Sequence, residues 1–376
     1  MSPRIYSSPY PARPIPRTST FTFLLSASSR DSERDGHSKS EAYIGNFPAT
    51  RTAFVDAQTG TSITRGQLRA MALAFGYGLQ ARFSPVGARR GDTVLVFSPN
   101  SLAWPVVLFG CVAAGLKVTT ANSAYTSREL AHQYVDSGAR IVIAADEGVD
   151  IVRGMFAKLG IAREDGDARV VVTCRGDLRW AGGPGTPLHP LATGLLRMED
   201  LLSLGALEEE ERFDGDLSDE TAYLCYSSGT TGKPKGVETT HYNAISLLTI
   251  VRTTFVPVQP TDVMIAILPF YHVYALMQVL QLPLIDGLPV VIQSRFEPTE
   301  YCANIARYGV SISLIVPPVL VVLARHAAAE EYDLSSLRYL CSGAAPLGKD
   351  LVQQVKARLS KRRKAGTVEV VVTQGY

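Results

Sequence analysis

Short apolar runs rich in β-branched residues alternate with helical segments along this chain, and that alternation restricts the fold more than any other feature of the sequence. Residues 93–97 (TVLVF) have the pattern of a buried strand. The turn residues 98–101 (SPNS) separate them from an apolar helical run that reaches Ala114 and Gly115. We therefore predict a strand, a turn and a helix in this order.

The same order recurs immediately afterwards. Thr126 and Glu129 have the spacing of a capping box, which predicts a helix through Val135 that Gly138 ends. Residues 141–144 (IVIA) then indicate another buried strand. Repeated units of this kind predict an α/β fold with largely parallel sheets.

The rest of the chain continues the pattern with two exceptions. Residues 175–220 hold a GGPG turn, a short helical stretch near 195–204 and the acidic run Glu208–Glu211, which together predict a surface connection with solvated charges. Residues 1–40, rich in Ser, Pro and Arg, predict a loosely held N-terminal arm that can lie against the body. Further strands are predicted at residues 263–268, 289–293, 313–316, 338–341 and 369–373.

Composition removes several classes of protein. The chain has 376 residues, of which 46% are hydrophobic and 19% charged, and its net charge is +2. These values exclude a chain that is disordered throughout, and the scattered basic residues favour neither nucleic acid nor an anionic membrane as a partner. No apolar stretch reaches the roughly 20 residues of a spanning helix, so we expect no transmembrane segment. The five cysteines lack CxxC spacing and are expected to be reduced and buried, as in an intracellular protein.

The strongest chemical signal is a glycine-rich segment that follows a strand. Residues 223–226 (YLCY) lead directly into residues 227–237 (SSGTTGKPKGV). Three glycines allow close approach of a ligand to backbone N–H groups, and four hydroxyls and two lysines add donors and positive charge, so the segment predicts a phosphate cradle. Pro234 after Lys233 excludes a P-loop of the GxxxxGK[ST] kind. The alternative is a flexible surface linker, although linkers rarely follow a buried strand at once.

At this segment the chain resembles the adenylate-forming (AMP-binding) acyl-CoA synthetases, and within them the 4-coumarate:CoA ligase-like enzymes. The string 227–237 matches their phosphate-loop signature, with His241 and Asn243 following as in the family. The other similar segments, in the family's order, are 122–126 (NSAYT) with Glu129, 268–274 (LPFYHVY), 342–347 (SGAAPL) and 374–376 (QGY).

The resemblance implies a fold, a domain organisation and a reaction. The fold is the N-terminal domain of an adenylate-forming enzyme, with stacked αβ subdomains that are incomplete at the C-terminal end. Residues 1–40 are expected to be the arm and residues 41–376 the AMP-binding domain, with the family's small C-terminal domain absent. The reaction is that of an acid-thiol ligase: a carboxylate and ATP give an acyl-adenylate, which coenzyme A then converts to a thioester. ATP, Mg²⁺ and coenzyme A are therefore the expected cofactors.

The resemblance also implies roles for individual residues. Lys233 is a weaker candidate than its neighbours, because members of the family vary there. No metal ligand is assigned within this chain. The residues expected to bind the nucleotide are Ser227, Ser228, Gly229, Thr230, Thr231, Gly232, Lys235, Gly343, Ala344, Ala345, Gln374, Gly375 and Tyr376.

The resemblance implies that four residues form the acid site. His272 is expected to be catalytic and to close the acid pocket near the carboxylate, although a lone histidine in an aromatic run is by itself more often a core residue. Tyr274, Gln278 and Gly343 are expected to line the pocket beside it, with packing as the alternative role of Tyr274. The expected substrates are aromatic acids such as cinnamates or phenylacetate, or medium-chain fatty acids, in phenylpropanoid or fatty acid metabolism.

The family places further groups beyond the motif that begins at Gln374: a Glu that binds Mg²⁺, an Asp on the ribose, a hinge and a mobile Lys. Because the sequence reaches only Tyr376, we expect a truncated ligase, and the activity of residues 1–376 alone stays open. The alternative is a catalytically inactive nucleotide-binding or interaction remnant. The expected location is the cytoplasm, with the peroxisome as the alternative for a longer form, since Gln374-Gly375-Tyr376 is not a peroxisomal tripeptide.

Overall fold

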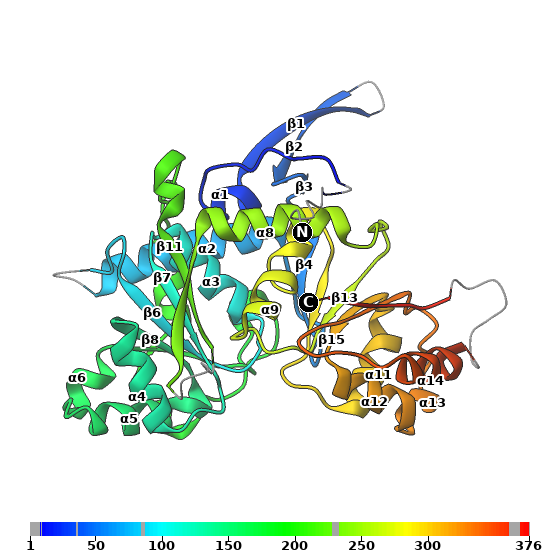
Figure 1. Ribbon diagram of the computed structural model, residues 1–376. Helices are drawn as coiled ribbons and strands as arrows, with labels where there is room; N and C mark the ends of the chain where they lie inside the picture. Colours follow the sequence, from blue (N-terminus) through cyan, green and yellow to red (C-terminus); the bar gives the residue numbers. More distant parts are fainter. Residues whose placement is uncertain are drawn as a thin grey trace, which may run out of the picture.

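Two seven-stranded sheets, each flanked by helices, form the body of the protein (Figure 1). The structure is a computed structural model, and it describes residues 8, 10–34, 37–83, 87–227, 233–360 and 369–375. Within these residues both sheets are mostly parallel, which confirms the predicted α/β fold of stacked αβ units.

The first sheet has the strand order β10-β9-β8-β6-β7-β11-β12. Only the last pair, β11 with β12, is antiparallel, and it encloses the predicted phosphate loop. Strands β6, β8 and β11 are those predicted at residues 93–97, 141–144 and 223–226, whereas the other strands of this sheet were not predicted. The bounds are β6 Thr93–Phe97, β7 Lys117–Ala121, β8 Ala139–Ala145, β9 Val170–Thr173, β10 Leu196–Arg197, β11 Thr221–Ser227 and β12 Lys235–Thr240.

Helices on the two faces of this sheet follow from their sequences. Helix α3 is apolar all round and buried along its whole length, while α4 begins at the predicted capping box, in which Thr126 and Glu129 satisfy each other's backbone N–H groups. The helices are α2 Arg65–Arg82, α3 Ala103–Ala113, α4 Ser127–Asp136, α5 Val149–Lys158, α6 Arg163–Asp167 and α7 Met198–Leu202. Short 3₁₀ turns are η1 Asp146–Gly148, η2 Arg179–Ala181, η3 Pro190–Ala192 and η4 Gly215–Asp219.

The second sheet has the order β17-β16-β15-β13-β14-β4-β5, and each strand predicted beyond residue 260 lies in it. Its strands are β4 Thr52–Asp56, β5 Ser62–Thr64, β13 Met264–Ala266, β14 Val290–Ile292, β15 Ile312–Ile315, β16 Tyr339–Ser342 and β17 Val371–Gln374. The remaining helices are α8 His241–Thr254, α9 Val273–Gln278, α10 Leu282–Asp286, α11 Pro298–Tyr308, α12 Pro317–Arg325, α13 Ala328–Glu331 and α14 Lys349–Ser360.

The N-terminal region differs from the expected loosely held arm. Helix α1 (Thr20–Leu25) buries Phe21, Leu24 and Leu25 in the main core, and the backbone N–H of Thr20 donates to Nδ1 of His241 at 3.2 Å. This part of the arm lies against the body, but helix α1 was not predicted, because apolar side chains in only one short segment were too few to indicate a helix. Strands β1 (Ala27–Arg34), β2 (His37–Ile44) and β3 (Phe47–Pro48) follow as a three-stranded antiparallel sheet.

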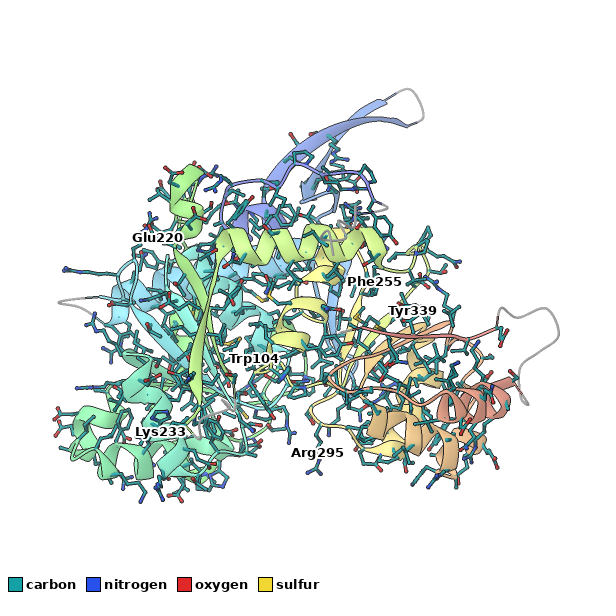
Figure 2. All side chains as sticks on the ribbon, viewed as in Figure 1. Trp104, Glu220, Lys233, Phe255, Arg295 and Tyr339 are labelled. Carbon is teal, nitrogen blue, oxygen red and sulfur yellow. The ribbon has the colours of Figure 1, made fainter. Side chains whose placement is uncertain are left out.

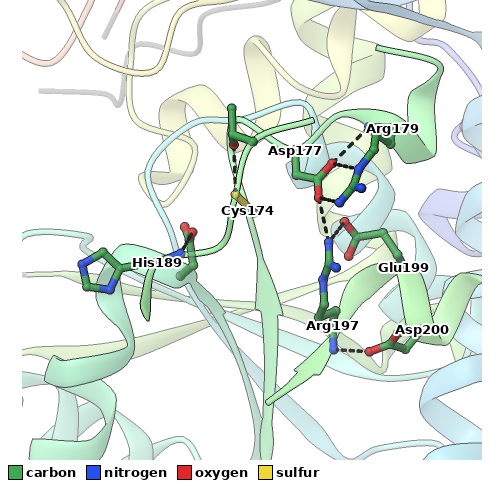
Figure 3. Close-up of polar contacts among 9 residues, drawn as sticks. Cys174, Asp177, Arg179, His189, Arg197, Glu199 and Asp200 are labelled. Carbon is green, nitrogen blue, oxygen red and sulfur yellow. Dashed lines mark hydrogen bonds and ion pairs between the residues drawn. The ribbon is translucent and has the colours of Figure 1, made fainter. Parts of the chain in front are cut away.

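Residues 175–220 also differ from the expected solvated connection. The carboxylate of Asp177 is buried and accepts from Arg179 and Arg197, and Arg197 also pairs with Glu199 (Figure 3). The hydrogen bonds from Arg179 hold the pKa of Asp177 at about 2. The prediction treated all charges here as solvated, whereas these side chains pair in the folded chain.

One residue of the acidic run 208–211 is likewise buried and paired instead of solvated. Glu210 is buried, accepts from the hydroxyl of Thr22 at 3.0 Å and lies 3.1 Å from Arg69. Its carboxylate therefore ties α1 to α2. Only the partners, which lie far away in sequence, distinguish Glu210 from its exposed neighbours.

The two sheets share one large core cluster, and specific polar contacts join them at its edge. The side-chain amide of Asn100, after β6, donates to Leu268 O at 2.8 Å and accepts from Phe270 N at 2.8 Å. Trp104 on α3 packs edge-on against Phe270, with ring centroids 5.9 Å apart. These contacts hold the segment before α9 against the first sheet.

Two further expectations concern the cysteines and the membrane. All five cysteines are free, as expected, and only Cys341 is partly exposed. Within the part of the chain that the structure describes, none of the helices combines the length and the apolar character needed to cross a membrane.

Candidate functional site

The predicted phosphate loop lies between two paired strands. Ser227 ends β11 and Lys235 begins β12 directly opposite it, and both side chains are exposed. The structure therefore places the entry and the exit of the loop side by side at the end of the first sheet, and Figure 2 shows Lys233 there. The predicted residues Ser228, Gly229, Thr230, Thr231 and Gly232 lie outside the described residues.

His272 is held at the start of α9. It is the N-cap residue, and its Nδ1 accepts a hydrogen bond from Tyr274 N at 3.2 Å. Since Nδ1 is an acceptor, the proton of the neutral ring is on Nε2, which is left to donate to a ligand. Partial burial lowers the pKa of His272, so the neutral form is favoured near pH 7.

Tyr274 and Gly343 lie in direct contact although 69 positions separate them in the sequence. A Cβ at Gly343 would lie 2.9 Å from two carbons of the Tyr274 ring, and the Tyr274 hydroxyl donates to Cys341 O at 3.4 Å. Burial raises the pKa of the Tyr274 phenol, which therefore stays protonated. The absence of a side chain at residue 343 leaves the space that the ring occupies. Gln278, the fourth residue predicted for the acid pocket, is half-buried at the end of α9.

The ends of β16 and β17 form the remaining predicted cluster. Gly375 N donates to Ser342 O at 2.9 Å, and the Gln374 side chain accepts from Leu347 N at 2.9 Å and donates to Leu347 O at 3.1 Å. Gln374 and Gly375 thus support the loop that carries Gly343, Ala344 and Ala345. Tyr376 lies outside the described residues.

Ala344 in this loop has an unusual backbone. Its φ of 68° makes it the one non-glycine residue with positive φ among those that the structure describes. A left-handed conformation costs a residue with a Cβ roughly 1–2 kcal/mol. Strain of this kind is often found where backbone groups are aimed at a ligand.

The structure brings together Tyr274, Gly343, Gln374 and Gly375, and it places His272 two residues from Tyr274. The loop stem at Ser227 and Lys235 belongs to the other sheet. Thr120, on β7, links strand β11 to the His272 segment: its hydroxyl donates to Tyr271 O at 2.7 Å and lies 3.7 Å from Cys225 Sγ on β11. The two predicted halves of the site therefore meet through the β7–β11 end of the first sheet.

His241 and Asn243, which follow the phosphate loop, have structural roles. Asn243 completes a capping box with Thr240 at the start of α8. His241 is buried against Phe213, with ring centroids 4.2 Å apart, and burial lowers its pKa to about 4. Its Nδ1 accepts from Thr20 N, so this histidine holds α1 in place.

A cavity of about 670 Å³ lies between the two sheets and was missed by the sequence analysis. Its walls come from residues after β6, β8, β13 and β14, at the carboxyl ends of parallel strands, where ligands of α/β proteins commonly bind. Arg175 and Arg295 are the cationic residues of this wall, and Arg175 lies 3.8 Å from Glu147, which also lines the cavity; Figure 2 labels Arg295. Arg295 follows the strand predicted at residues 289–293, which was an available signal, whereas Arg175 follows β9, a strand that was not predicted.

Within the described residues, no group of three or more His, Cys, Asp or Glu side chains is suited to hold a metal ion. The residues present in this part of the chain therefore do not fit a protein-bound Mg²⁺.

Comparison with known proteins gives one family. The family model described as AMP-binding enzyme matches residues 41–376. Among curated relatives, 4-coumarate--CoA ligase-like 4 of Oryza sativa subsp. japonica is 34% identical over 89% of this chain and 57% of its own length. 4-coumarate--CoA ligase 5 of the same organism is 30% identical over 87% of this chain and 54% of its own length. The chain thus spans about half the length of the curated relatives it matches.

Solved structures agree on the fold. A long-chain-fatty-acid-CoA ligase (FadD1) from Archaeoglobus fulgidus aligns with a TM-score of 0.74 at 21% identity and covers 99% of this chain and 66% of its own. The N-terminal domain of FACL13 from Mycobacterium tuberculosis aligns with a TM-score of 0.68 at 23% identity, over 87% of this chain and 72% of its own. At these identities the likeness shows the shared architecture.

Proposed function

The chain belongs to the AMP-binding enzyme family, and from this we propose that it is the nucleotide- and acid-binding part of an AMP-forming acid:CoA ligase. The observation that carries the proposal is the contact set around Gly343, which joins the acid-side residue Tyr274 to the nucleotide-side residues Gln374 and Gly375. A site that forms an acyl-adenylate needs both substrates at one point.

The proposed reaction has two steps. A carboxylate oxygen attacks the α-phosphorus of ATP, the bond to the β-phosphate oxygen breaks, and pyrophosphate leaves. The thiol sulfur of coenzyme A, after losing its proton, then attacks the acyl carbon, and AMP leaves with the electron pair of the acyl–oxygen bond. Both steps create negative charge that preorganised donors can stabilise.

The loop that begins at Ser227 and ends at Lys235 is proposed to hold the triphosphate. Its stem presents exposed hydroxyl and ammonium groups at the end of β11 and β12. Lys235 supplies positive charge as pyrophosphate separates. The loop after β16, with Gly343, Ala344 and Ala345, is proposed to receive the nucleoside, because these small residues allow a flat base to approach the backbone.

His272 is proposed to act on the acid. Its Nδ1 is occupied by Tyr274 N, so Nε2–H is the available donor, and it can hold one oxygen of the substrate carboxylate. The imidazole orients the carboxylate for attack without taking a proton from it, because a carboxylate needs no base at pH 7. Tyr274 and Gln278 are proposed to form the wall of the acid pocket beside it.

Coenzyme A is proposed to enter through the cavity between the sheets. The cavity volume of about 670 Å³ is within the range of a cofactor site, and Arg175 and Arg295 can pair with phosphate groups of an anionic ligand. No step is assigned to Mg²⁺, because the described residues hold no ligand set for it.

The substrate classes proposed are cinnamate-like or other aromatic acids and medium-chain fatty acids. Relatives named as 4-coumarate--CoA ligases support the aromatic class. Hydrolysis-resistant acyl-sulfamoyl adenosines, with either an aryl or an alkyl chain, test this directly because their binding needs no catalytic step.

The test is calorimetric titration of residues 1–376 with ATP, with GTP as control, and with the two kinds of acyl-sulfamoyl adenosine. The proposal predicts binding of ATP over GTP and tighter binding of one analogue class. Pyrophosphate exchange with a panel of acids is measured in parallel. Nucleotide binding without any exchange supports the inactive-remnant alternative, and no binding of either ligand overturns the proposal.

A further inference from the structure

Helix α4 contacts the phosphate loop on both sides of its stem. Nε2 of His132 lies 3.2 Å from the carbonyl oxygen of Pro234, just before β12. The hydroxyl of Tyr226, just before the last residue of β11, donates to Asp136 at 2.5 Å. The two contacts come from adjacent turns of one helix and reach the two strands that enter and leave the loop.

The direction of the His132 contact is determined by its partner. Because a carbonyl oxygen only accepts, Nε2 must carry the proton and donate it. The rings of His132 and Tyr226 also meet edge to face, with centroids 6.4 Å apart. This ring contact therefore also restrains the side chains of His132 and Tyr226 relative to each other.

The same helix is fixed to the rest of the site by its next residue. Gln133 is buried, and its side-chain amide donates to Thr119 Oγ1 at 2.8 Å and to Thr120 O at 3.1 Å. Thr120 in turn donates to Tyr271 O at 2.7 Å, one residue before His272. A short chain of hydrogen bonds thus leads from the loop stem through α4 to the acid-side histidine.

We propose that α4 is a brace that sets the position of the two ends of the phosphate loop, at Tyr226 and Pro234, relative to His272, with His132 and Tyr226 as positioning residues for ATP. This inference rests on the proposed function, since it assumes that the loop binds the nucleotide. His132 touches the stem, so its effect on the nucleotide passes through the backbone at Pro234. In the free protein the brace holds the stem in one arrangement, and this reduces the ordering that binding requires.

The test compares His132→Ala and Tyr226→Phe with Val135→Ala, a matched control on the exposed face of the same helix, where Val135 is 61% exposed. Loss of one hydrogen bond of about 1 kcal/mol predicts roughly fivefold weaker ATP affinity for each of the two variants. His132→Gln, whose amide can donate to the same carbonyl, is expected to stay within about twofold of wild type. Val135→Ala is expected to change nothing.

Hydrogen exchange measured by mass spectrometry supplies a readout that needs no nucleotide. Peptides covering residues 225–236 are expected to exchange faster in His132→Ala and Tyr226→Phe, and at the wild-type rate in His132→Gln and Val135→Ala. Melting temperatures show whether each variant is folded. Unchanged exchange and affinity in folded His132→Ala overturn the brace. If the wild type binds no ATP, the proposed function fails, while the exchange experiment still decides whether α4 holds the stem.

Discussion

The ring of Tyr274 occupies the space that a side chain at residue 343 would fill. A Cβ built on Gly343 comes within 2.9 Å of two ring carbons and 3.1 Å of the phenol oxygen. The ring cannot move freely, because its hydroxyl is hydrogen-bonded to Cys341 O and the side chain is partly buried. The shape of the proposed acid pocket is therefore defined by a pair of residues from α9 and from the end of β16.

Gly343→Ala is expected to displace the Tyr274 ring and to weaken binding of acyl-sulfamoyl adenosines by about tenfold, which corresponds to about 1.4 kcal/mol. In the Tyr274→Ala background the same substitution has no ring to displace, so it is expected to be nearly neutral. A double-mutant cycle measured by calorimetry gives the coupling energy. Additive effects would show that the two residues act independently.

Substitution can separate the N-cap role of His272 from its proposed role in binding the acid. His272→Ala removes both the N-cap acceptor and Nε2–H, whereas His272→Asn keeps a side-chain acceptor for Tyr274 N and removes only the imidazole. We expect His272→Asn to retain the wild-type melting temperature while both variants weaken acyl-sulfamoyl adenosine binding and leave ATP affinity nearly unchanged. Wild-type analogue affinity in His272→Asn would limit His272 to capping α9.

Ala344→Gly is expected to raise stability by up to about 1 kcal/mol, because glycine adopts a positive φ without the steric cost of a Cβ. Ala345→Gly is the matched control. Its backbone is not left-handed, so added freedom of the unfolded chain is expected to lower stability by roughly 0.5–1 kcal/mol. Urea unfolding of the two variants measures the difference, and equal destabilisation by both would argue against strain at Ala344.

The stability of the protein is expected to fall between pH 6.5 and pH 4 because of His241. Burial keeps this histidine neutral in the folded state, with a pKa of about 4, while in the unfolded chain it takes up a proton near its ordinary pKa of 6.5. The unfolded state thus binds more protons in this window, so stability decreases as the pH falls through it. The cost at pH 5 is about 2 kcal/mol for this group.

Urea unfolding at pH 7 and pH 5 tests this prediction, with His241→Gln as the comparison. Glutamine can still accept from Thr20 N but cannot take up a proton, so the variant is expected to lose less stability than the wild type on acidification. The same loss in both proteins would assign the acid sensitivity to other groups.

Local sequence patterns were sufficient for much of the architecture. β-branched runs such as residues 93–97 and 141–144 indicated β6 and β8, and the Thr126–Glu129 spacing indicated the start of α4. These features depend on backbone preferences and on contacts within a few residues, which the sequence displays directly. The motifs 227–237, 268–274, 342–347 and 374–376 likewise identified the family that the comparisons show.

The tertiary structure alone decided which residues meet. Phe21 and Glu210 lie in segments that composition marked as loose or solvated, yet both are buried because distant side chains cover or pair with them. The same holds for Tyr274 with Gly343, and for Arg175 with Arg295 at one cavity, since each pair joins elements far apart in the chain. Which side chains are buried or paired depends on how the two sheets pack. A local sequence pattern holds no information about contacts between residues so far apart in the chain. The sequence by itself determined the α/β architecture, several of its strands and helices and the family, whereas packing decided the shape of the proposed acid pocket and the partners of the buried charges.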